Sequence, residues 1–129
     1  MTHTFSVHVY YEDTDLAGIV YYANYLKFIE RARTEWVREM GVDQAALKQD
    51  EGLVFAVRRV EADYLIPAKF DDDLTVETRV DAITGVRIML TQEVKRGAQV
   101  LFVAQVTIVA ITESGHPARL PAIIRRNLH

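Results

Sequence analysis

The sequence predicts an α+β fold in which a curved antiparallel sheet wraps around one central helix. Only one long segment, residues 22–40, repeats its apolar side chains with the spacing of a helix face. Beyond residue 52, apolar and polar side chains mostly alternate, as they do in strands, and short turns separate the runs. One amphipathic helix cannot cover both faces of such a sheet. We therefore expect the sheet to curve around the helix and to leave an edge or its outer face for another subunit.

Composition and charge exclude several classes of protein. The 129 residues fit one domain, residues 1–129, and half of them are apolar. The net charge of -3 gives no reason to expect binding to nucleic acid or to an acidic membrane surface. The sequence has no cysteine, which excludes disulfides and thiolate chemistry. No apolar run is long enough for membrane insertion and the first residues lack a signal-peptide pattern, so a cytoplasmic location is the default expectation.

Local patterns predict the first strand and two helices. Residues 5–12 alternate, which predicts a strand whose buried row is Phe5, Val7, Val9 and Tyr11. The apolar face of the central helix contains Tyr22, Tyr25, Leu26, Ile29, Ala32, Trp36, Val37 and Met40. Gly41 stands where a helix stop is expected. Residues 43–51 predict a second, short helix with Asp43 as its N-cap and Gly52 at its end.

Four longer strands and a short tail follow. In residues 53–66 one side of the strand is expected to carry Val54, Ala56, Val60, Ala62, Tyr64 and Ile66. The inward row of residues 74–83 is expected to be Leu74, Val76, Val80 and Ala82, and Ile88, Leu90 and Val94 share one side of the next strand. Residues 99–112 are apolar on both alternations, which predicts coverage on both faces; at about 45 Å this strand requires a strongly twisted sheet. Residues 116–129 predict a loop and a short terminal helix or tail.

The loop before the central helix carries the candidate chemistry. Asp15 lies a few residues before the helix, and residues 18–22 lead into its start. The first N–H groups of a helix lack intrahelical partners, and the helix dipole makes that end partly positive. A carboxylate beside such donors can form half of an acyl-transfer site, because it acts as base or nucleophile while the donors hold the oxyanion. The alternative is that Asp13 or Asp15 only caps a turn or the helix start.

Other chemistries lack their residues or their spacing. The only serines, Ser6 and Ser114, lie outside any G-x-S-x-G motif, and none of the four histidines lies in this loop. Carboxylates at positions 12, 13 and 15 could bind a cation, but their spacing departs from an EF-hand loop, so we expect no metal. Glycine motifs for nucleotides are absent, and we expect no cofactor. The tyrosines of this region, Tyr25 among them, either pack in the core or an interface or line an acyl or aryl pocket.

Residues 10–25, YYEDTDLAGIVYYANY, closely resemble the signature loop and helix start of the hotdog-fold acyl-CoA thioesterases in the 4-hydroxybenzoyl-CoA thioesterase family. The resemblance continues through FIERARTE in the helix, Ala62-Asp63-Tyr64 with Pro67-Ala68, residues 72–74, and Ala118-Arg119-Leu120-Pro121. It covers nearly the whole chain. Within the family, the sequence looks most like the Tol-Pal-associated acyl-CoA thioesterases. The resemblance implies a hotdog domain, in agreement with the wrapped sheet expected from periodicity.

The resemblance also implies a role for each matching position. Asp15 matches the catalytic carboxylate, which acts as nucleophile or as general base for water. The backbone N–H of Tyr22 would polarise the thioester carbonyl, and Gly18 would let the loop backbone approach the substrate. Arg87 and Arg119 stand near positions that carry cations for the CoA phosphates in the family. Tol-Pal members often carry His at the position of Tyr22, whereas the hydroxybenzoyl branch carries Tyr.

These expectations combine into one reaction and two alternatives. The chain is expected to hydrolyse acyl-CoA thioesters as a homodimer or homotetramer. The first alternative is a hotdog module that binds acyl-CoA or an acylated carrier without turnover. The second is a dehydratase or hydratase, which would need a histidine paired with a carboxylate near the helix, and no histidine lies there.

Overall fold

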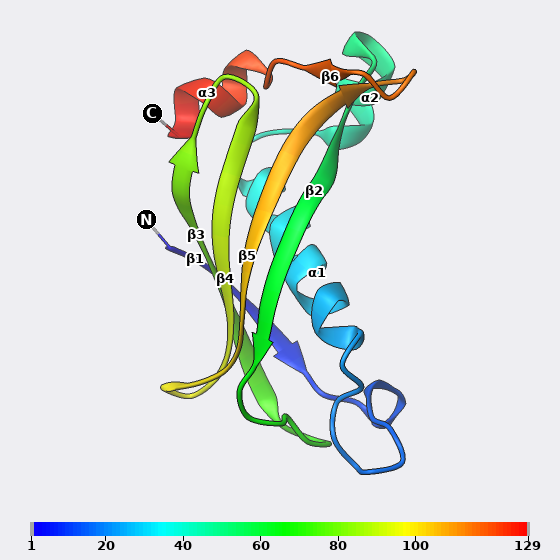
Figure 1. Ribbon diagram of the computed structural model, residues 1–129, viewed down its shortest axis with the longest axis vertical. Helices are drawn as coiled ribbons and strands as arrows, with labels where there is room; N and C mark the ends of the chain where they lie inside the picture. Colours follow the sequence, from blue (N-terminus) through cyan, green and yellow to red (C-terminus); the bar gives the residue numbers. More distant parts are fainter. Residues whose placement is uncertain (1, 129) are drawn as a thin grey trace.

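The computed structural model describes residues 2–128, and a single antiparallel sheet dominates it (Figure 1). The long strands are β1 (Thr2–His8), β2 (Leu53–Tyr64), β3 (Asp73–Ile83), β4 (Arg87–Arg96) and β5 (Gln99–Thr112). Their order across the sheet is β1-β3-β4-β5-β2, and the two-residue β6 (Pro117–Ala118) pairs with β5. β2 therefore crosses to the far edge beside β5 instead of pairing with β3, the next strand along the chain.

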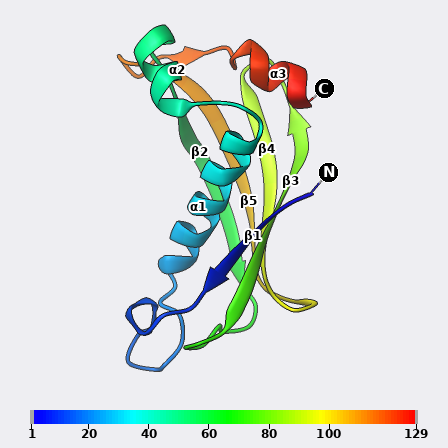
Figure 2. The ribbon, with the colours of Figure 1, turned by 180° about the vertical axis from the view of Figure 1, so that it is seen from behind.

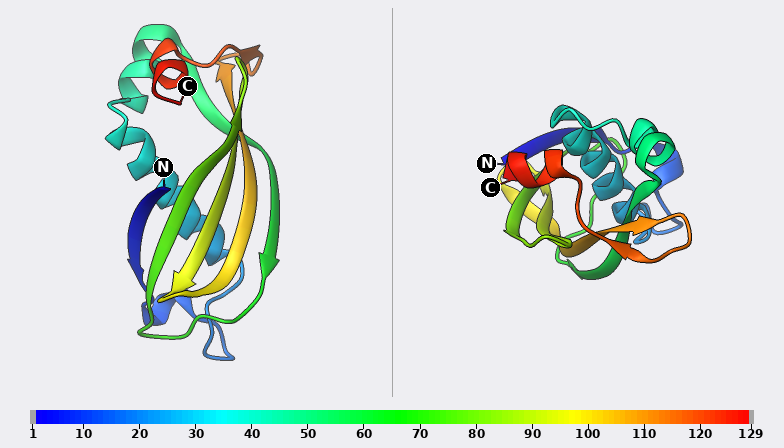
Figure 3. Two further views of the ribbon diagram at one scale, coloured as in Figure 1. Left: turned by 90° about the vertical axis from the view of Figure 1, so that its left-hand side faces the viewer. Right: turned by 90° about the horizontal axis from the view of Figure 1, so that it is seen from above.

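Helix α1 (Asn24–Glu39) lies along the concave face of this sheet, as Figures 2 and 3 show. Its buried side chains are Tyr25, Phe28, Ile29, Ala32 and Val37, and they pack against the inward rows of the strands. The predicted architecture, a curved sheet around one helix, is confirmed. The predicted apolar face was wrong at Tyr22 and Leu26, which are 62% and 41% exposed, because the helix begins only at Asn24 and its core-facing stripe passes through Phe28.

Short helical elements complete the chain. α2 (Gln44–Glu51) has the predicted cap, since the Asp43 carboxylate accepts a hydrogen bond from the Ala46 N–H at 3.0 Å. α3 (Ala122–Leu128) confirms the short helix expected within residues 116–129, and His129 lies outside the described residues. β1 ends at His8 and a 3-10 turn, η1 (Tyr11–Asp13), follows after two residues, so Tyr11 lies outside the strand and is 81% exposed, not buried as predicted. No helix within residues 2–128 is both long and apolar enough to cross a membrane.

Two β-bulges move side chains that simple alternation misplaces. In β2, Val57 opposes Ile108 and Arg59 opposes Thr107, so one residue has no counterpart and the alternation reverses. Phe55 therefore packs against the core, in place of the predicted Val54 and Ala56. A second bulge lies between Val80 and Ala82 of β3, which leaves Ala82 exposed and turns Ile83 toward the core, so the inward assignment of Ala82 was wrong.

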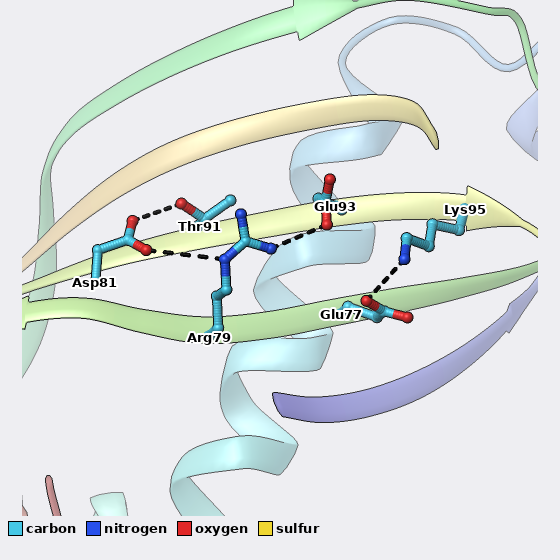
Figure 4. Close-up of polar contacts among 6 residues, drawn as sticks. All are labelled: Glu77, Arg79, Asp81, Thr91, Glu93 and Lys95. Atoms are coloured by element: carbon cyan, nitrogen blue, oxygen red, sulfur yellow. Dashed lines mark hydrogen bonds and ion pairs between the residues drawn. The ribbon is translucent and has the colours of Figure 1, made fainter. Parts of the chain in front are cut away.

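The outer face of the sheet is mostly polar over β3 and β4. β5 has the predicted bounds and its inner row is buried, but Gln105 on its outer row is exposed, so in this chain the strand is fully covered on one face only. Figure 4 shows a ladder of contacts between the neighbouring strands β3 and β4 on this face: Glu77 with Lys95 at 3.0 Å, Arg79 with Glu93 at 3.0 Å, and Asp81 with both Arg79 and Thr91. Both ion pairs are diagonal, because Glu77 lies directly opposite Glu93 and Arg79 lies opposite Thr91, so each glutamate is paired with a cation of the other strand.

A buried polar cluster connects the helix to the inner face of the sheet. Gln92, which is fully buried, donates from Nε2 to the Ile29 carbonyl at 3.0 Å and to the Thr78 hydroxyl at 2.9 Å. Its Oε1 accepts a hydrogen bond from the Arg33 guanidinium at 2.9 Å. Burial lowers the pKa of Arg33. The cluster ties α1 to β3 and β4 in the middle of an otherwise apolar core.

Candidate active site

The segment between β1 and α1 folds into a tight hairpin with Asp15 at its turn. Thr14 and Val20 form an isolated antiparallel bridge, and the Asp15 N–H donates to the Ile19 carbonyl at 2.9 Å. The Gly18 N–H closes the turn on the Asp15 carbonyl at 2.9 Å, and Gly18 has a φ of 77°, a conformation that favours glycine. The turn geometry therefore explains the glycine at position 18.

Both ends of this hairpin are tied to the β2–β3 connection. The Val9 N–H donates to the Asp72 carbonyl at 2.9 Å, before the hairpin. After it, the Val20 N–H donates to the Ala68 carbonyl at 2.9 Å, and Ile19 forms a bridge with Lys69. The position of Asp15 is thus set by the residues that link β2 to β3, at the end of the sheet where α1 begins (Figure 1).

The carboxylates of the loop stabilise turns. Oδ1 of Asp15 accepts a hydrogen bond from the Ala17 N–H at 2.9 Å, and Oδ2 of Asp13 accepts one from the Tyr10 N–H at 2.9 Å. The turn-capping interpretation is therefore correct for both residues, although neither caps α1. The Asp15 side chain is exposed, and its Oδ2 has no hydrogen-bond partner among residues 2–128. One oxygen therefore holds the carboxylate in place, and the other is left without a partner within the described chain.

Helix α1 begins without a side-chain cap and leaves backbone donors free. Its N-cap is Ala23, which makes no side-chain hydrogen bond. The Tyr21 carbonyl accepts from the Asn24 N–H at 2.8 Å, and the Tyr22 carbonyl accepts from the Tyr64 hydroxyl at 3.1 Å. Within the described chain, the N–H groups of Tyr22 and Ala23 have no acceptor. Two free donors therefore lie at the positive end of the helix dipole.

An apolar groove of about 380 Å³ lies against this helix start. It is lined by Ile19, Val20, Tyr22, Tyr25, Tyr64, Leu65, Ile66 and Pro67. Behind it, the Tyr25 ring stacks on Phe102 with ring centroids 5.0 Å apart. The Tyr25 hydroxyl accepts a hydrogen bond from the Ala68 N–H at 3.0 Å, and burial raises the pKa of Tyr25. Tyr25 thus packs in the core and also lines the groove, and its role toward an acyl or aryl group stays a prediction.

The predicted site residues fall into two groups. Asp15, Gly18, Tyr22 and Tyr25 lie at the end where α1 begins, whereas Arg87 and Arg119 lie beside the β3–β4 turn at the opposite end of the sheet (Figure 1). These two arginines flank the same turn, because the Leu120 N–H donates to the Gly85 carbonyl and the Arg119 guanidinium packs across that glycine. Neither arginine has an ion-pair partner among residues 2–128.

One lysine lies next to this site, whereas a second cavity lies away from it. Lys69, opposite Ile19, is the lysine of the connection that holds the hairpin. A second cavity of about 190 Å³ lies between the C-terminal half of α1 and the start of β2; Arg33, Trp36 and Phe55 line it, and Asp15 and Tyr22 do not. No group of three or more histidines and carboxylates within residues 2–128 is arranged to hold a metal ion.

Sequence reasoning missed the wall of the groove that the β2–β3 connection supplies. The alternation predicts a strand up to residue 66, whereas β2 ends at Tyr64, and Tyr64 lines the groove together with Leu65, Ile66 and Pro67 of the connection. The sequence does contain an indication of this wall. The apolar run Tyr-Leu-Ile stands directly before a proline, which ends the strand and leaves the apolar side chains available to pack outside the sheet.

Comparison with known proteins identifies the family. Residues 17–103 match the thioesterase superfamily model. The chain is 43% identical to the acyl-CoA thioesterase YbgC of Haemophilus influenzae over 98% of its own length and 93% of that protein. A probable thioesterase from Bartonella henselae is 40% identical and superposes with a TM-score of 0.90, covering 94% of this chain and 100% of that chain.

More distant structures share the fold. A 1,4-dihydroxy-2-naphthoyl-CoA thioesterase from Synechocystis superposes with a TM-score of 0.90 at 24% identity, covering 99% of this chain and 96% of that chain. The resemblance seen in residues 10–25 is therefore confirmed, together with the predicted hotdog architecture. This chain belongs to the thioesterase superfamily.

Proposed function

We propose that this protein hydrolyses acyl-CoA thioesters at the start of α1. The observation that carries the proposal is the pair of free N–H donors on Tyr22 and Ala23, which lie beside an apolar groove. They follow a hairpin that carries Asp15, one of whose two carboxylate oxygens has no hydrogen-bond partner within the described chain. These are the parts that acyl transfer needs: an oxyanion site, an acyl pocket and a base or nucleophile. The activities named for the relatives of Haemophilus influenzae and Escherichia coli support the same reaction.

In the proposed mechanism the acyl group occupies the groove and its thioester oxygen accepts hydrogen bonds at the helix start. Asp15 attacks the carbonyl carbon, the C–S bond breaks, and CoA leaves as a thiolate that takes up a proton from solvent. Water then cleaves the acyl–Asp15 anhydride and restores the carboxylate. Alternatively, Asp15 removes a proton from water as that water attacks the carbonyl. Because a thiolate is a good leaving group, neither route requires a general acid.

A homodimer accounts for the separation of the predicted CoA-binding arginines from Asp15. β2 is an edge strand, and its residues from 57 to 64 are exposed in the single chain. Val57, Val60 and Tyr64 on this strand are 45%, 39% and 44% exposed, which is a large apolar edge for a monomer. Antiparallel pairing of β2 with a second copy would cover this edge.

Such a dimer would also complete the site. A two-fold axis across β2 turns the second copy upside down, so its β3–β4 turn approaches the helix start of the first copy. Arg87 of the partner subunit and Arg119 of the partner subunit would then face the CoA phosphates at this site.

The charge change Val60→Asp should convert the dimer to a monomer in sedimentation velocity, with thioesterase activity lost. Retention of the dimer would argue against this edge.

The proposed reaction is tested by thiol release from short aliphatic, long aliphatic and 4-hydroxybenzoyl-CoA. The protein has no cysteine and adds no thiol background. We expect the wild type to release thiol at a rate that a metal chelator does not change. Asp15→Asn should lower this rate at least a hundredfold. Saturable acyl-CoA binding without release would instead support the non-catalytic module, in which Asp15 only caps its turn. The glutamine variants of Arg87 and Arg119 should raise KM for acyl-CoA but not for the matching acyl-pantetheine, which lacks the nucleotide phosphates.

A further inference from the structure

We propose that Tyr64 is a positioning residue, which holds the peptide between Tyr22 and Ala23 so that the Ala23 N–H serves as a second oxyanion donor. This inference rests on the proposed thioesterase reaction. It starts from one contact: the Tyr64 hydroxyl, at the end of β2, donates to the Tyr22 carbonyl oxygen at 3.1 Å. That contact joins the edge strand to the first residues before α1.

The Tyr22 carbonyl depends on this contact because the helix does not satisfy it. In a regular α-helix the N–H of Leu26 would donate to the Tyr22 carbonyl, four residues earlier. Here the Leu26 N–H donates to the Ala23 carbonyl at 3.2 Å, so the first turn is tightened. Within residues 2–128, the Tyr64 hydroxyl is the only donor to the Tyr22 carbonyl.

Fixing that carbonyl also fixes the Ala23 N–H. The two groups belong to one planar trans peptide, so they point in opposite directions. A hydrogen bond to the carbonyl additionally polarises the peptide and strengthens its N–H as a donor. The neighbouring peptide is anchored in the same way, because the Tyr21 carbonyl accepts from the Asn24 N–H at 2.8 Å. The N–H groups of Tyr22 and Ala23 are therefore both held, and both lack an acceptor within the described chain.

The surroundings of Tyr64 suit a fixed donor. Its ring makes edge contacts with Tyr22, Tyr25 and Phe102, at centroid distances of 6.2, 5.4 and 5.0 Å. These contacts hold the ring beside the groove, which it also lines. Burial, together with the neighbouring tyrosines 22 and 25, raises the pKa of Tyr64. The hydroxyl thus remains protonated, and able to donate, through the neutral pH range.

The test compares Tyr64→Phe with wild type, with Asp15→Asn, and with Tyr11→Phe as a matched control, since the Tyr11 hydroxyl makes no hydrogen bond within residues 2–128. Removal of a direct oxyanion donor costs about 10²–10³ in rate. Loss of its positioning should cost less, and we expect Tyr64→Phe to lower kcat about ten- to a hundredfold. KM should change less than threefold, because the phenylalanine ring keeps the groove wall. Tyr11→Phe should match wild type.

Two further measurements separate positioning from packing. Ala23→Pro removes the donor itself at a φ of -70°, which proline adopts, and should lower kcat by about a hundredfold. Difference infrared spectra of a ¹³C-labelled thioester bound to Asp15→Asn should show a carbonyl band at lower frequency than in water. In the double variant that also carries Tyr64→Phe, the carbonyl band should move part of the way back toward its frequency in water.

The outcomes distinguish this inference from the proposed function. If Asp15→Asn loses activity while Tyr64→Phe and Ala23→Pro retain theirs, the positioning role is overturned and the thioesterase reaction stands. A rise in KM at unchanged kcat would make Tyr64 only a groove wall, which also overturns the inference. If wild type releases no thiol from any substrate, the proposed function fails, and this inference fails with it.

Discussion

The buried Gln92 cluster provides a sharp test of how the helix is attached to the sheet. Gln92→Leu keeps the approximate size of the side chain but removes three hydrogen bonds, to the Ile29 carbonyl, the Thr78 hydroxyl and the Arg33 guanidinium. Each neutral bond contributes about 1 kcal/mol net and the charge-assisted one about 2 kcal/mol. The buried leucine returns roughly 1–2 kcal/mol through its apolar surface. We expect a net loss of about 2–3 kcal/mol in the free energy of unfolding.

Urea unfolding measures this loss through the fluorescence of Trp36, the only tryptophan, which lies on α1 three residues from Arg33. All variants are compared at one protein concentration, because the proposed dimer would make stability depend on it. Gln105→Leu is the matched control, since Gln105 is exposed on the outer face of β5 and should change stability by less than about 0.5 kcal/mol.

A double variant refines the result. Arg33→Met combined with Gln92→Leu removes both partners of the charge-assisted bond, so it should cost less than the sum of the two single changes. The reasoning is refuted if Gln92→Leu is as stable as Gln105→Leu, or if the two changes at positions 33 and 92 simply add.

Two other predictions concern the residues that hold the hairpin. The His8 ring lies between the carboxylates of Asp73, at 2.7 Å, and Asp71, at 3.2 Å, and these carboxylates raise the pKa of His8. The contribution of His8 to stability is therefore full below its unfolded pKa of about 6.5 and is lost as the pH rises through its folded pKa. His8→Asn should therefore lower the urea midpoint at pH 5.5 and have little effect at pH 9; an equal effect at both values would contradict the ion pairs. Gly18→Ala meets no atom within 4 Å of its added Cβ, so it should cost only the backbone strain of its positive φ, about 1–2 kcal/mol, and lower kcat by moving Asp15. Gly97→Ala, which has the same strain in a distant turn, should destabilise equally at unchanged kcat.

Elements set by local chemistry were predictable from the sequence. The bounds of β5 follow from an apolar run between two turns, the Asp43 cap from side-chain capping, and the stop at Gly41 from glycine at positive φ, all of which act over a few residues. The loop containing Asp15 was predictable for the same reason, because a carboxylate and a glycine before an amphipathic helix form a compact local pattern.

Features that depend on distant contacts were not predictable. Alternation cannot reveal a β-bulge, so it misplaced Ala82 and put Val54 in place of Phe55. Gln92 shares its alternation with Ile88 and Leu90, but its polar character gave no sign that a buried partner existed. Tyr64 forms a wall of the groove only because β2 lies at the edge of the sheet beside β5, which places the last residue of β2 next to the start of α1.

The most direct test of the account compares two neighbouring carboxylates in one assay. Glu12→Gln and Asp15→Asn each remove one negative charge from the same exposed loop, but only Asp15 lies in the hairpin that precedes the proposed oxyanion site. Turnover of the preferred acyl-CoA should fall at least a hundredfold for Asp15→Asn and stay within twofold of wild type for Glu12→Gln. Equal turnover for the two variants would contradict the assignment of Asp15 as the catalytic carboxylate.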